Sequence, residues 1–482
     1  MYEPDTHIHF VGIGGVGMAG IAELLFGMGY SVSGSDLNKG QLALHLEKSG
    51  VTVFKGHSSE NLPENTAVVV YSSAIPQDNP EIETARERGI PVVKRAEMLA
   101  ELMRSRYGIA VAGSHGKTTT TSITGHMLRS AGHDPSMAIG GRVLTSASGA
   151  RLGGGRFFVA EADESDGSFS LLKPALAVVT NIDNEHLSHY GSFENLLESF
   201  EEFLQNLPFY GLAVVCAEDS HSYLIGKRVK DSGRRRVRFY GFDERADIRA
   251  IDCRTEGFVS KFRVEVDYDK FAVKSQDRRG VESIEIELPL SGSHQILNSL
   301  AAIAIGIEVG TSLADIAKGL ASYPGVARRA EVLLDTEQLL VVDDYAHHPR
   351  EIAATIKAIK SGVAARMQKG GRLKVIFQPH RYSRTSELFE QFLDCFEGVD
   401  QLFISDIYAA GEKAIEGISS DNLSSKIKGV SATYVPGIEK EISKILADSS
   451  AGDVLLSMGA GSIGSIVREA ISGAGLLQVK AA

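Results

Sequence analysis

The residues best suited to chemistry lie in a glycine-rich turn, Ala112-Gly-Ser-His-Gly-Lys-Thr-Thr-Thr-Thr121, between an expected strand and an expected helix. In such a turn the backbone amides surround phosphates, a lysine meets the β- and γ-oxygens, and a hydroxyl reaches a bound Mg²⁺. Lys117 and Thr118 stand at these two positions, although Val111 occupies the place of the first glycine of the general pattern. The turn predicts a nucleoside triphosphate site made of Gly113, Ser114, His115, Gly116, Lys117, Thr118 and Thr119.

Acidic residues follow the next long apolar strand, in Glu161-Ala-Asp-Glu-Ser-Asp166. A phosphate-bound Mg²⁺ prefers hard oxygen donors and needs them at the end of a neighbouring strand. Glu161 is therefore the first candidate metal ligand and Glu164 the second. His186, at the end of Thr180-Asn-Ile-Asp-Asn-Glu-His186, is either a ligand of a second metal ion or a hydrogen-bonded structural residue.

A second glycine-rich turn, Val11-Gly-Ile-Gly-Gly-Val-Gly-Met18, also stands between a strand and a helix. Gly14, Gly15 and Gly17 would let the backbone approach a diphosphate, and Asp36 is placed to meet a ribose hydroxyl. Alone, this turn fits a dinucleotide-dependent dehydrogenase as well as a protein that binds a nucleotide sugar. Two turns of this kind indicate two phosphorylated ligands, which counts against the dehydrogenase.

Two arginines near the C-terminal third, Arg381 and Arg384, are three residues apart after an expected strand. Arginine grips a carboxylate with two parallel hydrogen bonds, a geometry that lysine cannot supply. The residues alone leave surface ion pairs and a carboxylate or phosphate clamp equally open. The pair His347-His348, taken alone, fits a structural or interfacial role.

The elements that position these residues follow from hydrophobic periodicity. Strands are predicted at Ile8–Val11, Ser31–Ser33, Ala67–Tyr71, Gly108–Ala112, Arg156–Ala160, Ala175–Thr180, Leu339–Val342, Lys374–Phe377, Gln401–Ser405 and Asp453–Ser457, and helices at Met18–Gly29, Glu81–Arg88, Gln295–Gly306 and Pro349–Lys360. Alternation between Ile248 and Leu290 predicts antiparallel strands. A chain of 482 residues is long enough for about three domains, which we place at 1–105, 106–325 and 326–482. The fold class is α/β.

Composition excludes several classes of protein. Hydrophobic residues make up 43% and charged residues 23%, which excludes a disordered chain, and the net charge of −11 argues against nucleic acid as a partner. The basic stretch from Lys227 to Arg238 is predicted to be a solvated loop, with an anion contact as the alternative. Three isolated cysteines form no metal-binding spacing and indicate no disulfide framework. With neither a signal peptide nor a membrane span expected, the predicted location is the cytoplasm.

The motifs in this order resemble the Mur ligase family, and in particular its alanine-adding branch. The resemblance is carried by both glycine turns and by Asp343-Asp-Tyr-Ala-His-His-Pro349, Phe377-Gln-Pro-His-Arg-Tyr-Ser-Arg-Thr385, Asp406-Ile-Tyr-Ala-Ala-Gly-Glu412 and Met458-Gly-Ala-Gly-Ser-Ile-Gly464. It implies a Rossmann-like UDP-binding domain, a central P-loop ATPase domain with a parallel sheet plus antiparallel strands, and a C-terminal Rossmann-like α/β domain. It also implies that ATP activates the lactyl carboxylate of UDP-N-acetylmuramate as an acyl phosphate, which L-alanine attacks, in peptidoglycan precursor synthesis.

The resemblance assigns roles to individual residues. It implies catalytic roles for Lys117, His186, Arg329 and His348. Thr118, Glu161 and His186 would bind Mg²⁺, or Mn²⁺ in its place. ATP would contact His294, Asn298, Arg329 and Asp344, and alanine would contact His348, His380, Arg381 and Arg384. Three departures from the family pattern stand at Glu185, Gln295 and Glu201. The first two lengthen a side chain beside the metal and adenine positions, and Glu201 replaces a lysine of the later-acting ligases.

Two rival functions are consistent with the same motifs. One is a ligase of the family that adds another amino acid or a recycled peptide, because two arginines do not select a methyl side chain. The other is a nucleotide-sugar sensor without turnover, which the intact Lys117, Thr118, Glu161 and His186 disfavour. The sequence leaves open whether the protein is a monomer or a homodimer.

Overall fold

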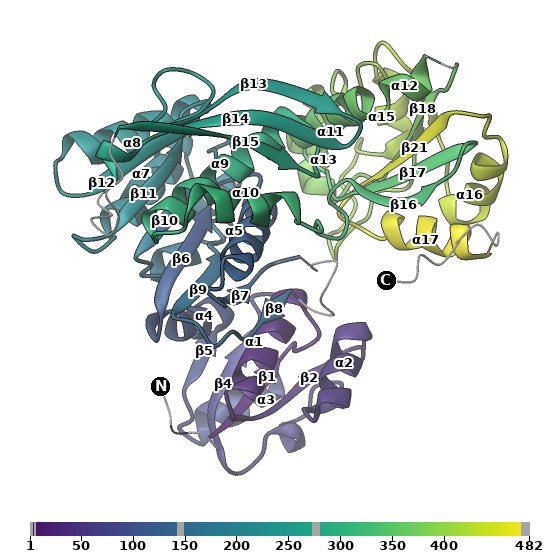
Figure 1. Cartoon of the computed structure of the whole chain (residues 1–482). Helices are drawn as coiled ribbons and strands as arrows, with labels where there is room; N and C mark the ends of the chain where they lie inside the picture. The colour runs from purple at the N-terminus through teal and green to yellow at the C-terminus, as the bar shows by residue number, and fades with distance from the viewer. Residues whose placement is uncertain (1–2, 4–5, 142–148, 272–279, 369, 474–482) are drawn as a thin grey trace. The chain divides into compact units, whose positions relative to one another are not determined.

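The structure of the chain is a computed structural model that describes residues 3, 6–141, 149–271, 280–368 and 370–473 (Figure 1). The chain divides into two compact units. The first comprises residues 1–253, 262–287 and 296–324, and the second residues 254–261, 288–295 and 325–482. Within the described residues, no helix has both the length and the apolar character needed to cross a membrane.

A five-stranded parallel sheet in the order β3-β2-β1-β4-β5 opens the first unit. Its strands are β1 (His7–Val11), β2 (Ser31–Asp36), β3 (Thr52–Lys55), β4 (Thr66–Tyr71) and β5 (Val92–Lys94), and its helices are α1 (Val16–Gly27), α2 (Gln41–Ser49), α3 (Pro80–Glu87) and α4 (Arg95–Arg104). Parallel strands joined by crossover helices are the arrangement predicted for this segment. Asn79 caps α3 and Pro80 occupies its first turn, which is where proline favours a helix start.

A buried carboxylate that the sequence did not reveal ties this sheet together. The side chain of Glu81, at the start of α3, is fully buried. It accepts hydrogen bonds from His9 Nε2 (3.1 Å), Ser35 Oγ (2.5 Å), the Ser58 N–H (3.1 Å) and Asn61 Nδ2 (2.8 Å). Burial alone would raise the pKa of Glu81, but the hydrogen bonds from His9, Ser35 and Asn61 outweigh it and the pKa is lowered. Glu81 therefore stays ionised and joins β1, β2 and the segment after β3.

Most residues of a ten-stranded sheet, in the order β15-β14-β13-β12-β11-β10-β6-β9-β7-β8, also belong to the first unit. The strands are β6 (Tyr107–Ala112), β7 (Ser136–Ala138), β8 (Ala150–Arg151), β9 (Phe157–Glu161), β10 (Leu176–Val179), β11 (Leu212–Cys216), β12 (Arg236–Gly241), β13 (Ile248–Glu256), β14 (Val259–Asp267) and β15 (Val281–Leu288). The six neighbouring strands β13, β12, β11, β10, β6 and β9, in this order across the sheet, are parallel to one another. Two residues separate the neighbouring strands β13 and β14, which requires an antiparallel hairpin, so the predicted antiparallel strands are confirmed.

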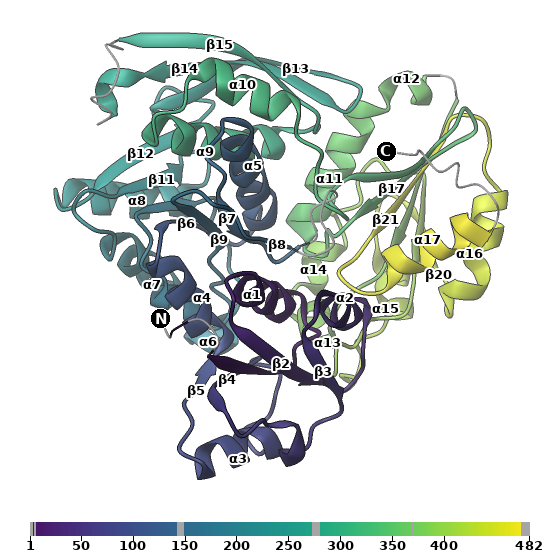
Figure 2. The same ribbon diagram turned by 60° about the horizontal axis from the view of Figure 1, so that its bottom comes forward.

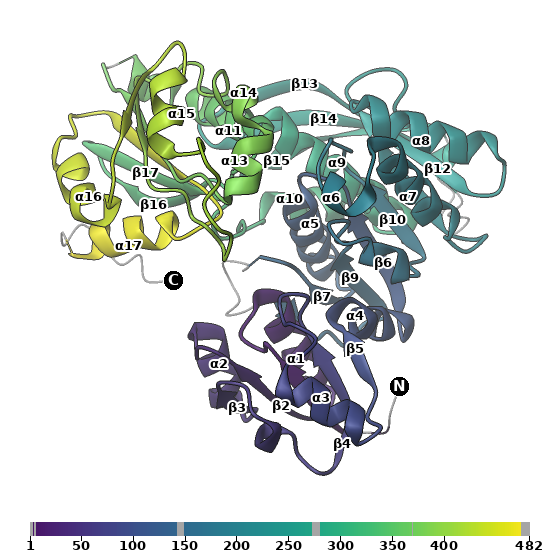
Figure 3. The same ribbon diagram turned by 180° about the vertical axis from the view of Figure 1, so that it is seen from behind.

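Helices cover this sheet. They are α5 (Lys117–Ser130), α6 (Leu187–Tyr190), α7 (Phe193–Gln205), α8 (Ser220–Asp231), α9 (Ser293–Glu308) and α10 (Leu313–Ala321). Figure 2 shows α5 beside α10, and Figure 3 shows α7 beside α8; both pairs pack together. Apolar residues of α1, α4 and α7 belong to one continuous core, so the two sheets of this unit share a hydrophobic interior.

The prediction of a solvated loop from Lys227 to Arg238 is wrong. Helix α8 continues to Asp231, and β12 begins at Arg236. Arg236 donates two hydrogen bonds of 2.8 Å to the Glu308 carboxylate. The alternating buried residues of β12 and the buried face of α8 fix these elements, and the charges lie on their outer sides.

The second unit is built on a six-stranded sheet in the order β16-β17-β21-β18-β19-β20, in which only the β16–β17 pair is antiparallel among the described strands. The strands are β16 (Glu331–Asp335), β17 (Leu339–Asp344), β18 (Leu373–Phe377), β19 (Gln401–Ile404), β20 (Ser431–Tyr434) and β21 (Asp453–Met458); the helices are α11 (Pro349–Gly362), α12 (Ala364–Met367), α13 (Tyr382–Glu387), α14 (Phe389–Phe392), α15 (Ser420–Lys426), α16 (Ile438–Ala447) and α17 (Ile463–Gly473). Alternate strand residues face two separate cores. One core is shared with α11, α14 and α15, and the other with α16 and α17. The structure therefore has the α/β form predicted for this segment, with a helical layer on each face of the sheet.

Candidate functional site

The glycine turn between β6 and α5 can only be built from glycine at two positions. Gly113 has φ +129° and Gly116 has φ +84°, a region that other residues rarely adopt. A Cβ on Gly113 would lie 2.1 Å from Thr180 Oγ1, and a Cβ on Gly116 would lie 2.6 Å from Asn298 Oδ1. The backbone of the turn is therefore held close to its neighbours, as a phosphate-binding loop requires.

The segment after β10 fixes the turn through hydrogen bonds that sequence analysis missed. The Asn181 carbonyl accepts from the Ser114 N–H at 3.0 Å, and Asn181 Oδ1 accepts from the His115 N–H at 2.9 Å. Thr180 Oγ1 donates to the His115 carbonyl at 2.6 Å, and the Asp183 N–H donates to Ser114 Oγ at 2.8 Å. The available signal was a run of polar residues directly after a buried strand. These contacts preorganise the turn.

The ammonium of Lys117 is held at the same turn. Its Nζ donates to the carbonyls of Gly113 at 2.6 Å and Ser114 at 3.2 Å, and to Glu164 Oε1 at 2.8 Å. Burial would lower the pKa of Lys117, but the carboxylates of Glu164 and Asp163 outweigh burial and raise it. Lys117 is therefore a fixed positive charge at the start of α5.

The acidic segment after β9 offers hard oxygen donors around this lysine. Glu164, the second of the two predicted ligands, is the one that contacts Lys117, whereas Glu161 Oε1 accepts from the Gly140 N–H at 2.8 Å. The other oxygen of Glu164, Oε2, is buried and has no hydrogen-bond partner among the residues that the structure describes. Thr118 lies half-buried in the first turn of α5. Carboxylate and hydroxyl oxygens suit Mg²⁺, and an orphaned buried carboxylate oxygen fits a cation.

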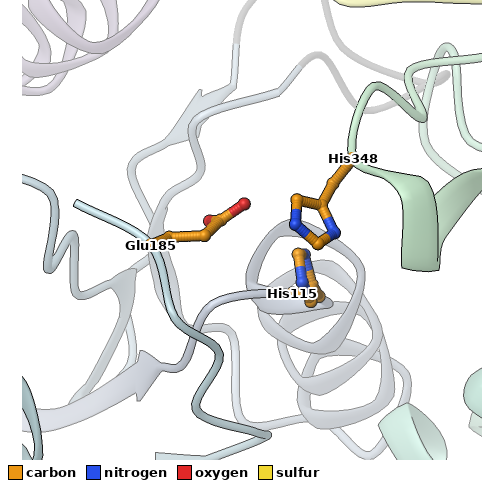
Figure 4. Close-up of side chains that lie close together, drawn as sticks. All are labelled: His115, Glu185 and His348. Carbon is orange, nitrogen blue, oxygen red and sulfur yellow. The ribbon is translucent and has the colours of Figure 1, made fainter. Parts of the chain in front are cut away.

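His186 adopts φ +59° immediately before α6, which is uncommon for a residue other than glycine and is found at functional sites. Its Nε2 lies 3.8 Å from Glu164 Oε1 and 3.7 Å from Glu185 Oε2. Glu185 in turn has a carboxylate oxygen within 4.8 Å of a ring nitrogen of His115 (Figure 4). The structure thus brings the predicted residue His186 to the acidic segment. His348, also drawn in Figure 4, belongs to the second unit.

The first glycine turn is supported by Asp36. Asp36 Oδ2 accepts from the Gly14 N–H at 2.9 Å, and Oδ1 accepts from the Asn38 N–H at 3.2 Å. Helix α1 follows with Gly15 as its N-cap, without a side-chain cap or an acidic residue in its first turn. Uncapped N–H groups at a helix start favour an anion. The observed role of Asp36 is to shape the turn, and its contact with a ribose stays a prediction.

In the second unit, Asp344 is 6% exposed and both of its oxygens are engaged. Oδ2 accepts from the Ala330 N–H at 2.7 Å, and Oδ1 accepts from the Ala346 N–H at 2.8 Å and from Thr355 Oγ1 at 3.3 Å. Burial raises the pKa of Asp344 to about 6. The carboxylate therefore joins the segment before β16 to α11, and its predicted contact with a nucleotide remains untested.

The second unit also contains Arg329 and His294, which are predicted to contact ATP, and His348, which is predicted to be catalytic and to contact alanine. The Arg329 guanidinium stands 5.1 Å from the ring centre of Tyr345. His348 is 2% exposed and caps α11, where its Nδ1 accepts from the Arg350 N–H at 3.3 Å. Burial lowers the pKa of His294 to about 4, with Arg329 acting in the same direction. His294 is therefore neutral near pH 7.

The segment after β18 contains three of the four residues predicted to contact alanine, namely His380, Arg381 and Arg384. The His380 ring stacks on Tyr408 with centroids 5.5 Å apart, and Arg384 Nη1 lies 3.3 Å from His380 Nδ1. Arg381 is exposed, has φ +71°, and donates its N–H to the Tyr408 carbonyl at 2.8 Å. Burial, followed by the charges of Arg384 and Arg381, lowers the pKa of His380 to about 4. Both arginines thus lie beside a neutral histidine, an arrangement suited to a carboxylate.

Three parts of the chain match models of one protein family. The Mur ligase family, catalytic domain, matches residues 7–107; the Mur ligase middle domain matches residues 111–306; and the Mur ligase, glutamate ligase domain, matches residues 328–461. A protein of Geotalea daltonii named UDP-N-acetylmuramate–L-alanine ligase is 47% identical over 466 residues, which cover 96% of this chain and 97% of that protein. A protein of the same name from Geobacter sp. strain M21 is 46% identical, with 96% of each chain covered.

Solved structures extend the likeness to the fold. The crystal structure of UDP-N-acetylmuramate–alanine ligase from Thermotoga maritima superimposes with a TM-score of 0.78 at 28% identity, covering 97% of this chain and 99% of that one. A murein peptide ligase from Psychrobacter arcticus has a TM-score of 0.69 at 24% identity, covering 98% and 99%, and shares the fold. These matches extend over nearly the whole chain, and the protein therefore belongs to the Mur ligase family.

Proposed function

We propose that this chain is an ATP-dependent ligase that joins L-alanine to the lactyl carboxylate of UDP-N-acetylmuramate in cytoplasmic peptidoglycan precursor synthesis. The observation that carries the proposal is Lys117, held by Glu164 at a preorganised phosphate loop. The substrate assignment is supported by the names of the relatives that are 46% and 47% identical over almost the full length.

The reaction requires activation because a carboxylate is a poor electrophile. The carboxylate oxygen attacks the γ-phosphorus of ATP, and the bond to the β-phosphate oxygen breaks, giving an acyl phosphate and ADP. The alanine amine then attacks the acyl carbon, loses a proton, and expels inorganic phosphate. Lys117 and the amides of residues 113–116 hold the phosphate oxygens, since phosphoryl transfer relies on positioning and on cancelling charge.

Mg²⁺, or Mn²⁺ in its place, would be held by Thr118, Glu161 and His186, with the orphaned oxygen of Glu164 as a further donor. Bound there, the ion neutralises the charge that develops on the transferred phosphate. His186 is the candidate that links this position to Glu164.

The remaining roles follow the same proposal. The first glycine turn, with Gly14, Gly15, Gly17 and Asp36, binds the nucleotide sugar. Residues proposed to contact ATP, besides the phosphate loop, are His294, Asn298, Arg329 and Asp344, and those proposed to receive alanine are His348, His380, Arg381 and Arg384. The domain boundaries near residues 105 and 325 remain part of this proposal.

The test is release of inorganic phosphate from ATP and Mg²⁺ in the presence of UDP-N-acetylmuramate, with each candidate amino acid added in turn. We expect release to require the UDP-sugar, to be strongest with L-alanine, and to match a ligated product by mass. Stronger release with another amino acid would identify another ligase of the family. Tight binding of both nucleotides without any release would favour a sensor.

A further inference from the structure

Arg95, the first residue of α4, lies against the helix that follows the first glycine turn. A Cβ placed on Gly17 would come within 3.2 Å of both Cδ and Nη1 of Arg95. Gly17 is in the first turn of α1, where N–H groups lack a side-chain cap. The absence of a side chain at Gly17 therefore lets the guanidinium reach the start of this helix.

The same guanidinium also faces the acidic segment that follows β9. Arg95 Nη2 lies 3.6 Å from Asp163 Oδ2. Asp163 directly precedes Glu164, the partner of Lys117. Burial would raise the pKa of Asp163, but Lys117, the hydrogen bonds from Ser165 and, more weakly, Arg95 outweigh burial and lower it, so Asp163 is ionised near pH 7. Arg95 thus lies between the start of α1 and the acidic segment that contains the partner of Lys117.

Stability does not account for this placement. The side chains of Arg95 and Asp163 are 29% and 44% exposed, and their separation exceeds hydrogen-bonding distance. An exposed pair of this kind contributes about 0–1 kcal/mol. Among the residues that the structure describes, Asp163 is the one carboxylate that forms an ion pair with Arg95, so the planar fork of Arg95 has further donors to offer a ligand.

We propose that Arg95 binds an anionic oxygen of the nucleotide sugar, and that Asp163 is a positioning residue that holds the guanidinium at the start of α1. The inference rests on the proposed function. A diphosphate at the start of α1 and a carboxylate brought to the phosphate loop are both anions, and Arg95 contacts both the start of α1 and Asp163, the neighbour of Glu164. Arginine suits either anion because its fork donates two parallel hydrogen bonds.

The test is calorimetric titration of the full chain with UDP-N-acetylmuramate, with UDP-N-acetylglucosamine, which lacks the lactyl carboxylate, and with UDP. We expect Arg95→Ala to weaken binding of UDP-N-acetylmuramate by about 10- to 100-fold, the range for a lost charged hydrogen bond, and Arg95→Lys to weaken it less. The dissociation constant for ATP should change by about twofold or less, because the pair is exposed. The matched control is Arg104→Ala, which removes an exposed arginine from the last turn of α4.

The ligand series identifies the anion. Weaker binding of all three ligands by Arg95→Ala would assign the contact to the diphosphate, and weaker binding of UDP-N-acetylmuramate alone would assign it to the carboxylate. Unchanged binding of all three, while the unaltered protein binds normally, would overturn the inference and leave the proposed function intact. An unaltered protein that binds no UDP-sugar would instead refute the proposed function, and this inference with it.

The positioning role of Asp163 has its own test. We expect Asp163→Asn to weaken UDP-N-acetylmuramate binding less than Arg95→Ala does, and to have no further effect when Arg95 is already alanine, because it acts through Arg95. Additive losses in the double variant would show that Asp163 acts independently and would overturn the positioning role.

Discussion

Replacement of Lys117 by alanine separates what this lysine does for the fold from what it does for the reaction. Its Nζ lies 2.8 Å from Glu164 Oε1, with side chains 17% and 2% exposed. Removal of one partner of a buried pair costs about 3–5 kcal/mol, because the other charge is left unpaired. Loss of one electrostatic contact to the transferred phosphate costs about 2.7–4 kcal/mol in the transition state, or about 10²- to 10³-fold in turnover.

The two effects can be measured apart with a double variant. Turnover is followed by phosphate release, and stability by the first thermal unfolding transition of the full chain. We expect Lys117→Ala to lose both, and Lys117→Ala with Glu164→Gln to regain most of the stability and none of the turnover, because a neutral amide removes the unpaired charge. Lys173→Ala is the control, since Lys173 is exposed and donates to one carbonyl, that of Ser170.

Binding of the UDP-sugar should stay nearly unchanged in Lys117→Ala, because the first glycine turn belongs to a different sheet. A turnover within about tenfold of the unaltered protein would contradict the electrostatic role. Equal losses of ATP and UDP-sugar affinity in a folded variant would contradict the division between the two turns.

Three further outcomes are expected. Arg381→Lys should raise the KM for L-alanine more than the KM for ATP, since a point charge replaces a planar fork; an unchanged alanine dependence would remove Arg381 from the clamp. Gly116→Ala should weaken ATP binding by about tenfold or more, because the backbone φ at this position is +84° and the new Cβ would lie 2.6 Å from Asn298 Oδ1. The control is Gly132→Ala, where φ is +83° and no atom lies within 4 Å of the new Cβ. This variant has the same backbone strain without the clash and should bind ATP normally. Glu81→Gln should lower the unfolding free energy by about 2–4 kcal/mol near pH 7. Because the pKa of Glu81 is lowered on folding, that difference should shrink as the pH falls below 4.5, and a difference independent of pH in urea titrations would refute the ionised state.

The sequence by itself determined many of the elements and the two glycine-rich turns. Buried strands such as β6 and β21 are short apolar runs, and turns such as Gly113–Gly116 require glycine, so both are visible in local order. The predicted strands and helices recur in the structure with shifts of a few residues at their ends. The basic stretch from Lys227 to Arg238 was misjudged because local charge gives no information about the partner, Glu308, that Arg236 meets.

Only the tertiary structure decided which side chains share a site. It placed Glu164 rather than Glu161 on Lys117, and Asn181 under the phosphate loop. It also buried Glu81 at the start of a helix whose existence, but not its buried carboxylate, was predicted, and set Arg95 against Gly17. These pairs are separated by tens of residues along the chain, and hydrogen bonds and charges act over a few ångströms. Their partners are therefore fixed by the packing of the sheets, which local sequence order does not encode.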